Sequence, residues 1–219
     1  MSEFEVTERN RLMRYPKRAS YDRAVIYPII DEALVCHVSF ALDGQPFVIP
    51  TIHARDGDSI LLHGLKGGRL LEYIEAGNPV AIAMTIVDGI VFARTVFNHS
   101  MNYRSVVLFG RGKIVEEPEA KLAALHRLTE RVIPGRWEEA RAPNEKEIKA
   151  TTIVAIDIEQ ATSKCRQGPP GDDGEDLEFP VWAGVLPTPI VTQAAQTDPK
   201  QTAGFAVPDY VKNFDPAKR

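Results

Sequence analysis

Cysteine is scarce in this chain, and the sequence contains no long hydrophobic run. The two cysteines, Cys36 and Cys165, have no metal-binding spacing and are too few for a disulfide framework. No apolar run approaches the ~20 residues that a membrane span needs, and the N-terminus lacks the apolar stretch of a secretory signal. We therefore expect a soluble, cytoplasmic protein in a reducing environment, without a membrane partner.

An excess of positive charge is also missing. The formal net charge is −4, which argues against a dedicated nucleic-acid binder. The two common phosphate-binding glycine patterns, the P-loop and the Rossmann fingerprint, are absent as well. What is present is a chain of 219 residues, 44% hydrophobic and 26% charged, long enough to bury a sizeable core in one domain.

Apolar runs and turn signals alternate through most of the chain. Strands are expected at residues 34–42, 47–54, 59–63, 80–87, 90–97, 103–115 and 151–158. Tight hairpin turns are predicted at Asp43-Gly44 and Asp88-Gly89. Helical spacing of apolar residues predicts helices at residues 22–33, at 118–132, and from residue 69 to a stop at Gly77.

These elements predict an α+β fold, a mostly antiparallel barrel of six or seven strands with two or three peripheral helices. We divide the chain into a polar N-terminal arm (1–24), one β-rich domain (25–187) and an extended C-terminal tail (188–219). The tail is rich in Pro, Thr and Gln, and we expect it to wrap the surface or a partner subunit.

Residues 58–77 are the most informative stretch, because they predict a strand, a basic glycine-rich loop and a short helix. Gly67 permits positive φ and close approach of a ligand to the backbone. The cations of Lys66 and Arg69 stand beside the N–H groups of the helix start, as an anion such as phosphate requires. The alternative is an ordinary strand-to-helix loop with two solvated cations.

Further polar residues gather in two other segments. Residues 98–105 place Tyr103, Arg104 and Ser105 at the start of a long strand. They form either a polar ligand site or a solvated loop. Trp182 follows a Gly- and Pro-rich segment, and its ring could stack on a planar ligand or fill the core.

The order and spacing of several motifs resemble the FMN-binding split-barrel flavoproteins related to pyridoxamine 5′-phosphate oxidase. Within that family the chain looks closest to the branch of the 5-nitroimidazole-resistance proteins. The resemblance covers residues 12–187 and rests on FVIPTI, ILLHGLKGGRLLEYIEAGNPVAIAMT, NYRSVVLFGRGKIVEE, the PGR step at 134–136, SKCRQGPPG and PVWAGVLP.

The resemblance implies FMN as cofactor, bound at the interface of a homodimer. Lys66 and Gly67 would bind its phosphate, and Tyr103, Arg104 and Ser105 would reach the phosphate or ring edge across the interface. His63 would lie beside the reactive face of the flavin and is the candidate catalytic residue. The remaining residues implied at the ring are Val48, Ile49, Pro50, Thr51, Ile52, Leu62 and Trp182.

The function implied is reduction or oxidation of a small molecule through bound flavin. Vitamin B6 oxidation is not expected, because the chain after Trp182 lacks the Arg-x-His substrate motif of the true oxidases. Two alternatives stay open: a flavin-binding protein without turnover, and a haem-binding split barrel with His63 or His99 as axial ligand. No metal site is expected, because the histidines have no metal-ligand spacing.

Overall fold

The protein is described by a computed structural model covering residues 2–201 and 204–216. Residue 1 of the expected arm and residues 202–203 and 217–219 of the expected tail lie outside the described residues. The strands are β1 Ala19–Ser20, β2 Cys36–Leu42, β3 Gln45–Thr51, β4 Ala54–Asp56, β5 Ser59–Leu65, β6 Pro79–Phe92, β7 Ser100–Ile114, β8 Thr151–Asp157, β9 Gln160–Arg166 and β10 Gly184–Pro187.

The α-helices are α1 Arg23–Glu32, α2 Arg69–Glu75, α3 Pro118–Val132, α4 Glu145–Ala150 and α5 Asp209–Lys212. Short 3-10 turns are η1 Pro16–Arg18, η2 Val96–Asn98 and η3 Gly174–Glu178. No helix within the described ranges is both long and apolar enough to cross a membrane.

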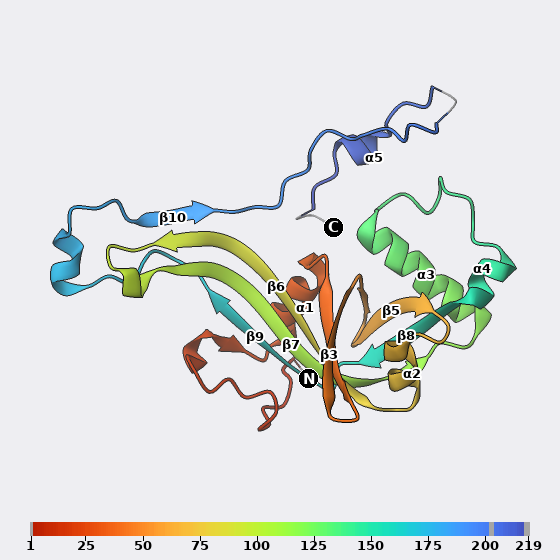
Figure 1. The fold of residues 1–219 in the computed structure, drawn as a ribbon, viewed down its shortest axis with the longest axis horizontal. Helices are drawn as coiled ribbons and strands as arrows, with labels where there is room; N and C mark the ends of the chain where they lie inside the picture. The colour runs from red at the N-terminus through yellow and green to blue at the C-terminus, as the bar shows by residue number, and fades with distance from the viewer. Residues whose placement is uncertain (1, 202–203, 217–219) are drawn as a thin grey trace.

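The strands form one antiparallel sheet that curls around the core without closing (Figure 1). Its main path runs β3-β2-β6-β7-β8-β5-β4, with β9 paired to β7 and β1, and β10 paired to β6. The two end strands, β3 and β4, are consecutive in the chain and separated only by Ile52 and His53. The predicted α+β split barrel is confirmed, with seven strands in the main path among the described residues.

Helix α1 packs its apolar side into this curled sheet. Asp22 caps the helix by accepting a hydrogen bond from the backbone N–H of Ala24 at 2.9 Å. Ile26, Ile29 and Ile30 recur at helical spacing and are buried in the main core. Glu32, the last residue of α1, takes part in the polar contacts described below.

One predicted turn is wrong. Residues 80–97 were expected to be two strands joined by a hairpin at Asp88-Gly89, but β6 runs without a break from Pro79 to Phe92. The pairing with β7 shifts register between Val87 and Gly89, so Asp88 is a bulge. A Cβ on Gly89 would lie 2.9 Å from the carbonyl oxygen of Leu186, so the glycine is needed for β10 to pack there.

The turn between β6 and β7 comes at residues 93–99. It forms the tip of the long hairpin made by these two strands, which is called the arm below (Figure 1). Asp172 holds this turn by accepting hydrogen bonds from the N–H of Arg94 at 2.7 Å and the side chain of Asn98 at 3.1 Å. Phe97 at the tip is 94% exposed, and Val96 is 88% exposed. The tip of the arm therefore presents two large apolar side chains to solvent.

The C-terminal segment from residue 188 follows β10 away from the arm and passes near α3 (Figure 1). The hydroxyl group of Tyr210 on α5 donates to Glu139 at 2.8 Å and accepts from Arg136 at 3.1 Å. The segment is thus tied to the loop that follows α3.

Candidate functional site

His63 lies on β5 with its side chain on the outside of the barrel, facing α3. Its neighbour Leu62 points inward and is buried in the core, as alternation along a strand requires. His63 lines a cavity of about 200 Å³ whose other walls are apolar except for one threonine: Ile52, Leu125, Leu128, Thr129, Val132 and Ile133. The imidazole makes no hydrogen bond or ion pair within the described part of the chain. It is therefore available to a ligand.

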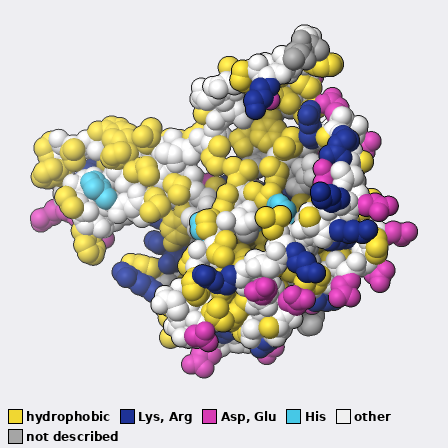
Figure 2. All heavy atoms as spheres, turned by 45° about the vertical axis from the view of Figure 1, so that its right-hand side comes forward, with side chains coloured by type: hydrophobic (Ala, Val, Ile, Leu, Met, Phe, Trp, Pro, Cys, Tyr) yellow, Lys and Arg dark blue, Asp and Glu magenta, His cyan; other side chains and the backbone are white. Residues whose placement is uncertain are grey.

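A second cavity of about 340 Å³ adjoins the first and shares Val132 and Ile133 with it. Its outer wall comes from the C-terminal segment, including Thr192, Tyr210 and Phe214. In Figure 2 hydrophobic side chains gather on the face below that segment, with histidine beside them. The two cavities form an apolar region between α3, the sheet and the C-terminal segment.

The glycine-rich loop after β5 leaves one cation free. Gly67 has a φ of 84°, which favours glycine, and Gly68 forms the N-cap of α2. The guanidinium of Arg69 stacks over the Phe47 ring at 4.6 Å, so it is held against β3. Lys66 is exposed and has no partner among the described residues. Of the two loop cations, Lys66 is the one free to bind an anion.

The β3 residues predicted at a flavin ring divide between the two faces of that strand. Ile49 packs against the core, whereas Val48 is 60% exposed and Pro50 is exposed on the outer face. The hydroxyl of Thr51 donates to the carbonyl oxygen of Ile52 at 3.3 Å. Ile52 is the residue of this group that shares a cavity with His63.

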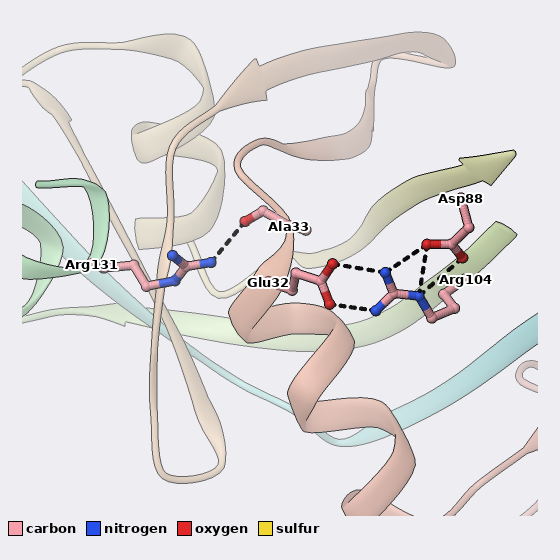
Figure 3. Close-up of polar contacts among 5 residues, drawn as sticks. All are labelled: Glu32, Ala33, Asp88, Arg104 and Arg131. Carbon is pink, nitrogen blue, oxygen red and sulfur yellow. Dashed lines mark hydrogen bonds and ion pairs between the residues drawn. The ribbon is translucent and has the colours of Figure 1, made fainter. Parts of the chain in front are cut away.

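Arg104 is held between two carboxylates (Figure 3). It donates to Asp88 on the paired strand at 2.7 to 3.2 Å and to both carboxylate oxygens of Glu32 at the end of α1, one of them at 2.7 Å. These hydrogen bonds raise the pKa of the guanidinium above its usual range, Glu32 contributing most. A phosphate would have to displace one of these carboxylates to reach Arg104.

The other predicted residues on β7 and beyond lie apart from His63 within one chain. The hydroxyl of Ser105 donates to the carbonyl oxygen of Lys164 at 3.1 Å, and Tyr103 pairs with Arg166 on β9. Trp182 lies against Phe92 of the arm, with ring centroids 5.7 Å apart. A site that uses these residues together with Lys66 or His63 needs a second subunit.

A cavity of about 430 Å³ surrounds the Arg104 cluster and was not expected from the sequence. It contains His37 and Thr85 from the sheet, Pro187 at the end of β10, and Pro189 and Ile190 from the C-terminal segment. His37 was not among the site residues expected from the sequence. No local pattern could have revealed the cavity, because its residues come from α1, β2, β6, β7 and the C-terminal segment.

Comparison with known proteins identifies the family. The family model for pyridoxamine 5′-phosphate oxidase matches residues 22–165, which is more than half of the chain. The chain belongs to the pyridoxamine 5′-phosphate oxidase family. The match spans the barrel from α1 to β9 and includes His63, Lys66 and Arg104. No curated protein matches the chain.

Two solved structures of the family's fold resemble the chain over nearly its whole length. A flavocytochrome from Azotobacter vinelandii is 35% identical, with a TM-score of 0.88 over 95% of this chain and 97% of its own. An FAD- and haem-binding protein from Mycobacterium smegmatis is also 35% identical, with a TM-score of 0.84 over 89% of this chain and 96% of its own.

A more distant structure is a proposed 5-nitroimidazole antibiotic resistance protein from Bacteroides thetaiotaomicron. It is 22% identical, with a TM-score of 0.57 over 67% of this chain and 85% of its own. This similarity supports the fold alone. The expected relation to flavin-binding split barrels, with a nitroimidazole-resistance-like member among the neighbours, is thereby confirmed.

Proposed function

We propose that this protein is a flavocytochrome, a redox protein that binds a flavin and a haem. The observation that carries the proposal is the similarity, along nearly the whole chain, to two solved proteins described as a flavocytochrome and as an FAD- and haem-binding protein. Flavin and haem were alternatives in the sequence analysis, and we now propose that the protein binds both. FAD replaces FMN as the first candidate, and FMN stays the second.

The surroundings of His63 fit a haem. Haem iron is commonly held by a histidine imidazole, and the ring system needs an apolar slot. His63 offers a free imidazole at an apolar cavity, and the adjoining cavity extends this region beneath the C-terminal segment. His99, the other candidate ligand, accepts a hydrogen bond from the N–H of Ala93 through Nδ1 at 2.9 Å. His63 is therefore the better candidate.

The glycine-rich loop fits the phosphate end of a flavin. Lys66 supplies an unpaired positive charge, and the positive φ of Gly67 lets a phosphate approach the backbone. Val48 and Pro50 present an exposed apolar strip on the outer face of β3. Arg104, in contrast, fits a structural ion pair better than a phosphate contact, because two carboxylates hold it.

A bound flavin would supply two-electron transfer and a haem one-electron transfer. The chain's own contribution is to hold these groups in apolar slots that exclude water and to place His63 and Lys66 at them. We propose oxidoreduction of a small molecule as the activity. The electron donor and acceptor stay open, as does a binding role without turnover.

We further propose a homodimer with the cofactor sites at the subunit interface. Tyr103, Ser105 and Trp182 lie away from His63 and Lys66 in one chain, so they contribute to a shared site only from a second copy. The arm supports this arrangement, because Phe97 and Val96 are almost fully exposed at its tip. A cytoplasmic location stays a prediction from the sequence.

An absorption spectrum of the purified protein tests the proposal, followed by chromatography of the released cofactors. A Soret band together with flavin peaks near about 370 and 450 nm is the expected result. Chromatography of the released flavin then distinguishes FAD from FMN. If the protein binds flavin but no haem when haem is supplied, it is a flavoprotein only. If it binds neither flavin nor haem after both are supplied, the proposal is overturned.

A further inference from the structure

A polar cleft lies on the side of α3 away from His63. It has a volume of about 720 Å³ and is open to solvent between the end of α1, β4 and α3. Its lining is mostly charged: Asp31, Arg55, His126, Arg127, Glu130 and Arg131, with Ala54 and Ala123. None of the flavin or haem candidates described above lines it.

The two carboxylates of the cleft accept hydrogen bonds from groups other than Arg127 and Arg131. Asp31 accepts two hydrogen bonds from Arg55, one of them at 2.9 Å. Glu130 accepts from the backbone N–H groups of Gly135 at 2.7 Å and Trp137 at 2.9 Å. These backbone contacts lower the pKa of Glu130, so its carboxylate stays ionised. Its hydrogen bonds hold the loop that follows α3.

Arg131 is a half-buried cation without a carboxylate partner. Its one hydrogen bond in the described part of the chain goes to the carbonyl oxygen of Ala33 at 3.1 Å (Figure 3), and its Nε is buried with no acceptor. Burial lowers the pKa of its guanidinium, which Asp31 and Glu32 offset only in part. A buried charge without a counterion is costly, and an anion in the cleft would relieve that cost.

Two more donors stand on the same side of α3. Arg127 is four residues before Arg131 and therefore about one turn away along the helix. It pairs with Asp56 at 3.2 Å, but both side chains are about half exposed, so this ion pair is weak and easily exchanged. His126 packs its ring edge-on against Trp137 and also lines the cleft.

We propose that this cleft binds the phosphate group of a small molecule, held by Arg131, Arg127 and His126. Two guanidinium groups and an imidazole line the cleft from the same side of α3, and together they offer donors to several acceptor oxygens of a phosphate. Nη2 of Arg131 donates to Ala33, so Nη1 is the terminal nitrogen left for a ligand. The cleft is larger than a phosphate alone, which leaves room for the rest of a phosphorylated molecule.

Calorimetric titration of the purified dimer or monomer with inorganic phosphate and with AMP tests this proposal. Arg127→Gln is the main variant, because its exposed side chain can be changed without disturbing the core. It should weaken binding by at least about tenfold. Arg131→Gln should do the same, with its folding checked by circular dichroism. Arg141→Gln, which removes an exposed arginine outside the cleft, is the matched control.

Lys66→Gln separates this site from the proposed flavin phosphate site, and it should leave cleft binding unchanged. Tighter binding of AMP than of inorganic phosphate assigns the cleft to a phosphorylated molecule, and the reverse assigns it to free phosphate. The proposal is overturned if wild-type protein binds neither probe, if Arg127→Gln binds as wild type does, or if Lys66→Gln abolishes the binding.

Discussion

Asp88 on β6 accepts three hydrogen bonds of 2.7 to 3.2 Å from the guanidinium of Arg104 on β7. Asp88 is the bulge residue of its strand and has no backbone partner on β7. A bulge turns a side chain away from the regular alternation of a strand. The Asp-Gly pair that looks like a hairpin turn therefore serves to aim a carboxylate at an arginine.

Replacing Arg104 should destabilise the protein more than it affects flavin binding. Arg104→Gln leaves Glu32 and Asp88 close together without a cation, each less than one third exposed. We expect a loss of about 1–3 kcal/mol in the free energy of unfolding. Urea titration measures this loss, and the flavin content of the purified variant should match that of wild type. Loss of flavin in a stably folded variant would instead support the phosphate role predicted from the sequence.

Lys66 should be required for tight flavin binding and not for folding. Lys66→Ala removes the one unpaired cation at the glycine-rich loop, and we expect at least about tenfold weaker flavin binding with an unchanged thermal midpoint. Fluorescence titration of the flavin-free protein measures the affinity. Lys146→Ala on α4, another exposed lysine, is the control and should bind flavin like wild type. Equal affinities of the two variants would remove Lys66 from the site.

His63→Ala should lose haem and keep flavin. The imidazole is the candidate iron ligand at the apolar cavity beside α3, so the Soret band should disappear or shift while the flavin peaks remain. His99→Ala is the matched comparison, because the sequence offered both residues as axial ligands. If His99→Ala loses haem and His63→Ala keeps it, the assignment is reversed.

His53 should make stability depend on pH near neutrality. It is 2% exposed, and burial lowers the pKa of its imidazole, which the hydrogen bond to the carbonyl oxygen of Ile30 offsets only in part. The unfolded chain then binds a proton below about pH 6.5 that the folded protein rejects, so stability is complete above that pH and falls as pH drops toward the folded pKa.

The slope from His53 should not exceed about 1.4 kcal/mol per pH unit. Urea unfolding of wild type and His53→Gln at a series of pH values measures it. The variant should lack this part of the pH dependence. If the free energy of unfolding depends on pH in the same way for wild type and His53→Gln, the prediction for His53 is wrong.

Gly110→Ala should unfold the protein or cost about 3 kcal/mol. An added Cβ would lie only 1.9 Å from the carbonyl oxygen of Asp157, a backbone atom that cannot move aside without breaking the sheet. Gly171→Ala is the control, because its Cβ would meet no atom within 4 Å. Thermal unfolding monitored by circular dichroism compares the two, and a similar midpoint for both would contradict this packing.

The sequence predicted the elements whose local signals agree with their surroundings. Helix α3 begins and ends as expected, because Pro118 suits a first turn and the apolar stripe to Val132 packs on the sheet. The hairpin between β2 and β3 was predicted for a similar reason: Asp43 and Gly44 both have positive φ there.

The predictions from sequence failed at positions where contacts between distant parts of the chain determine the structure. At Asp88-Gly89 the turn signal was overridden by pairing with β7 and β10, which a local pattern does not record. Strand β9 was missed because Ser163 and its neighbours are polar, although they are buried between β1 and β7. The ion pair of Arg104 with Glu32 joins residues 72 positions apart, so only the fold could reveal it.

Helix α3 lies between the apolar cavity at His63 and the charged cleft lined by Arg127 and Arg131. At 3.6 residues per turn, Thr129 points almost directly away from both Arg127 and Arg131, and Leu125 points almost directly away from Arg127. A rigid helix cannot approach the sheet on one side without receding on the other. Because α3 lines both the apolar cavity at His63 and the arginine cleft, we expect a shift of this helix that narrows the first to widen the second.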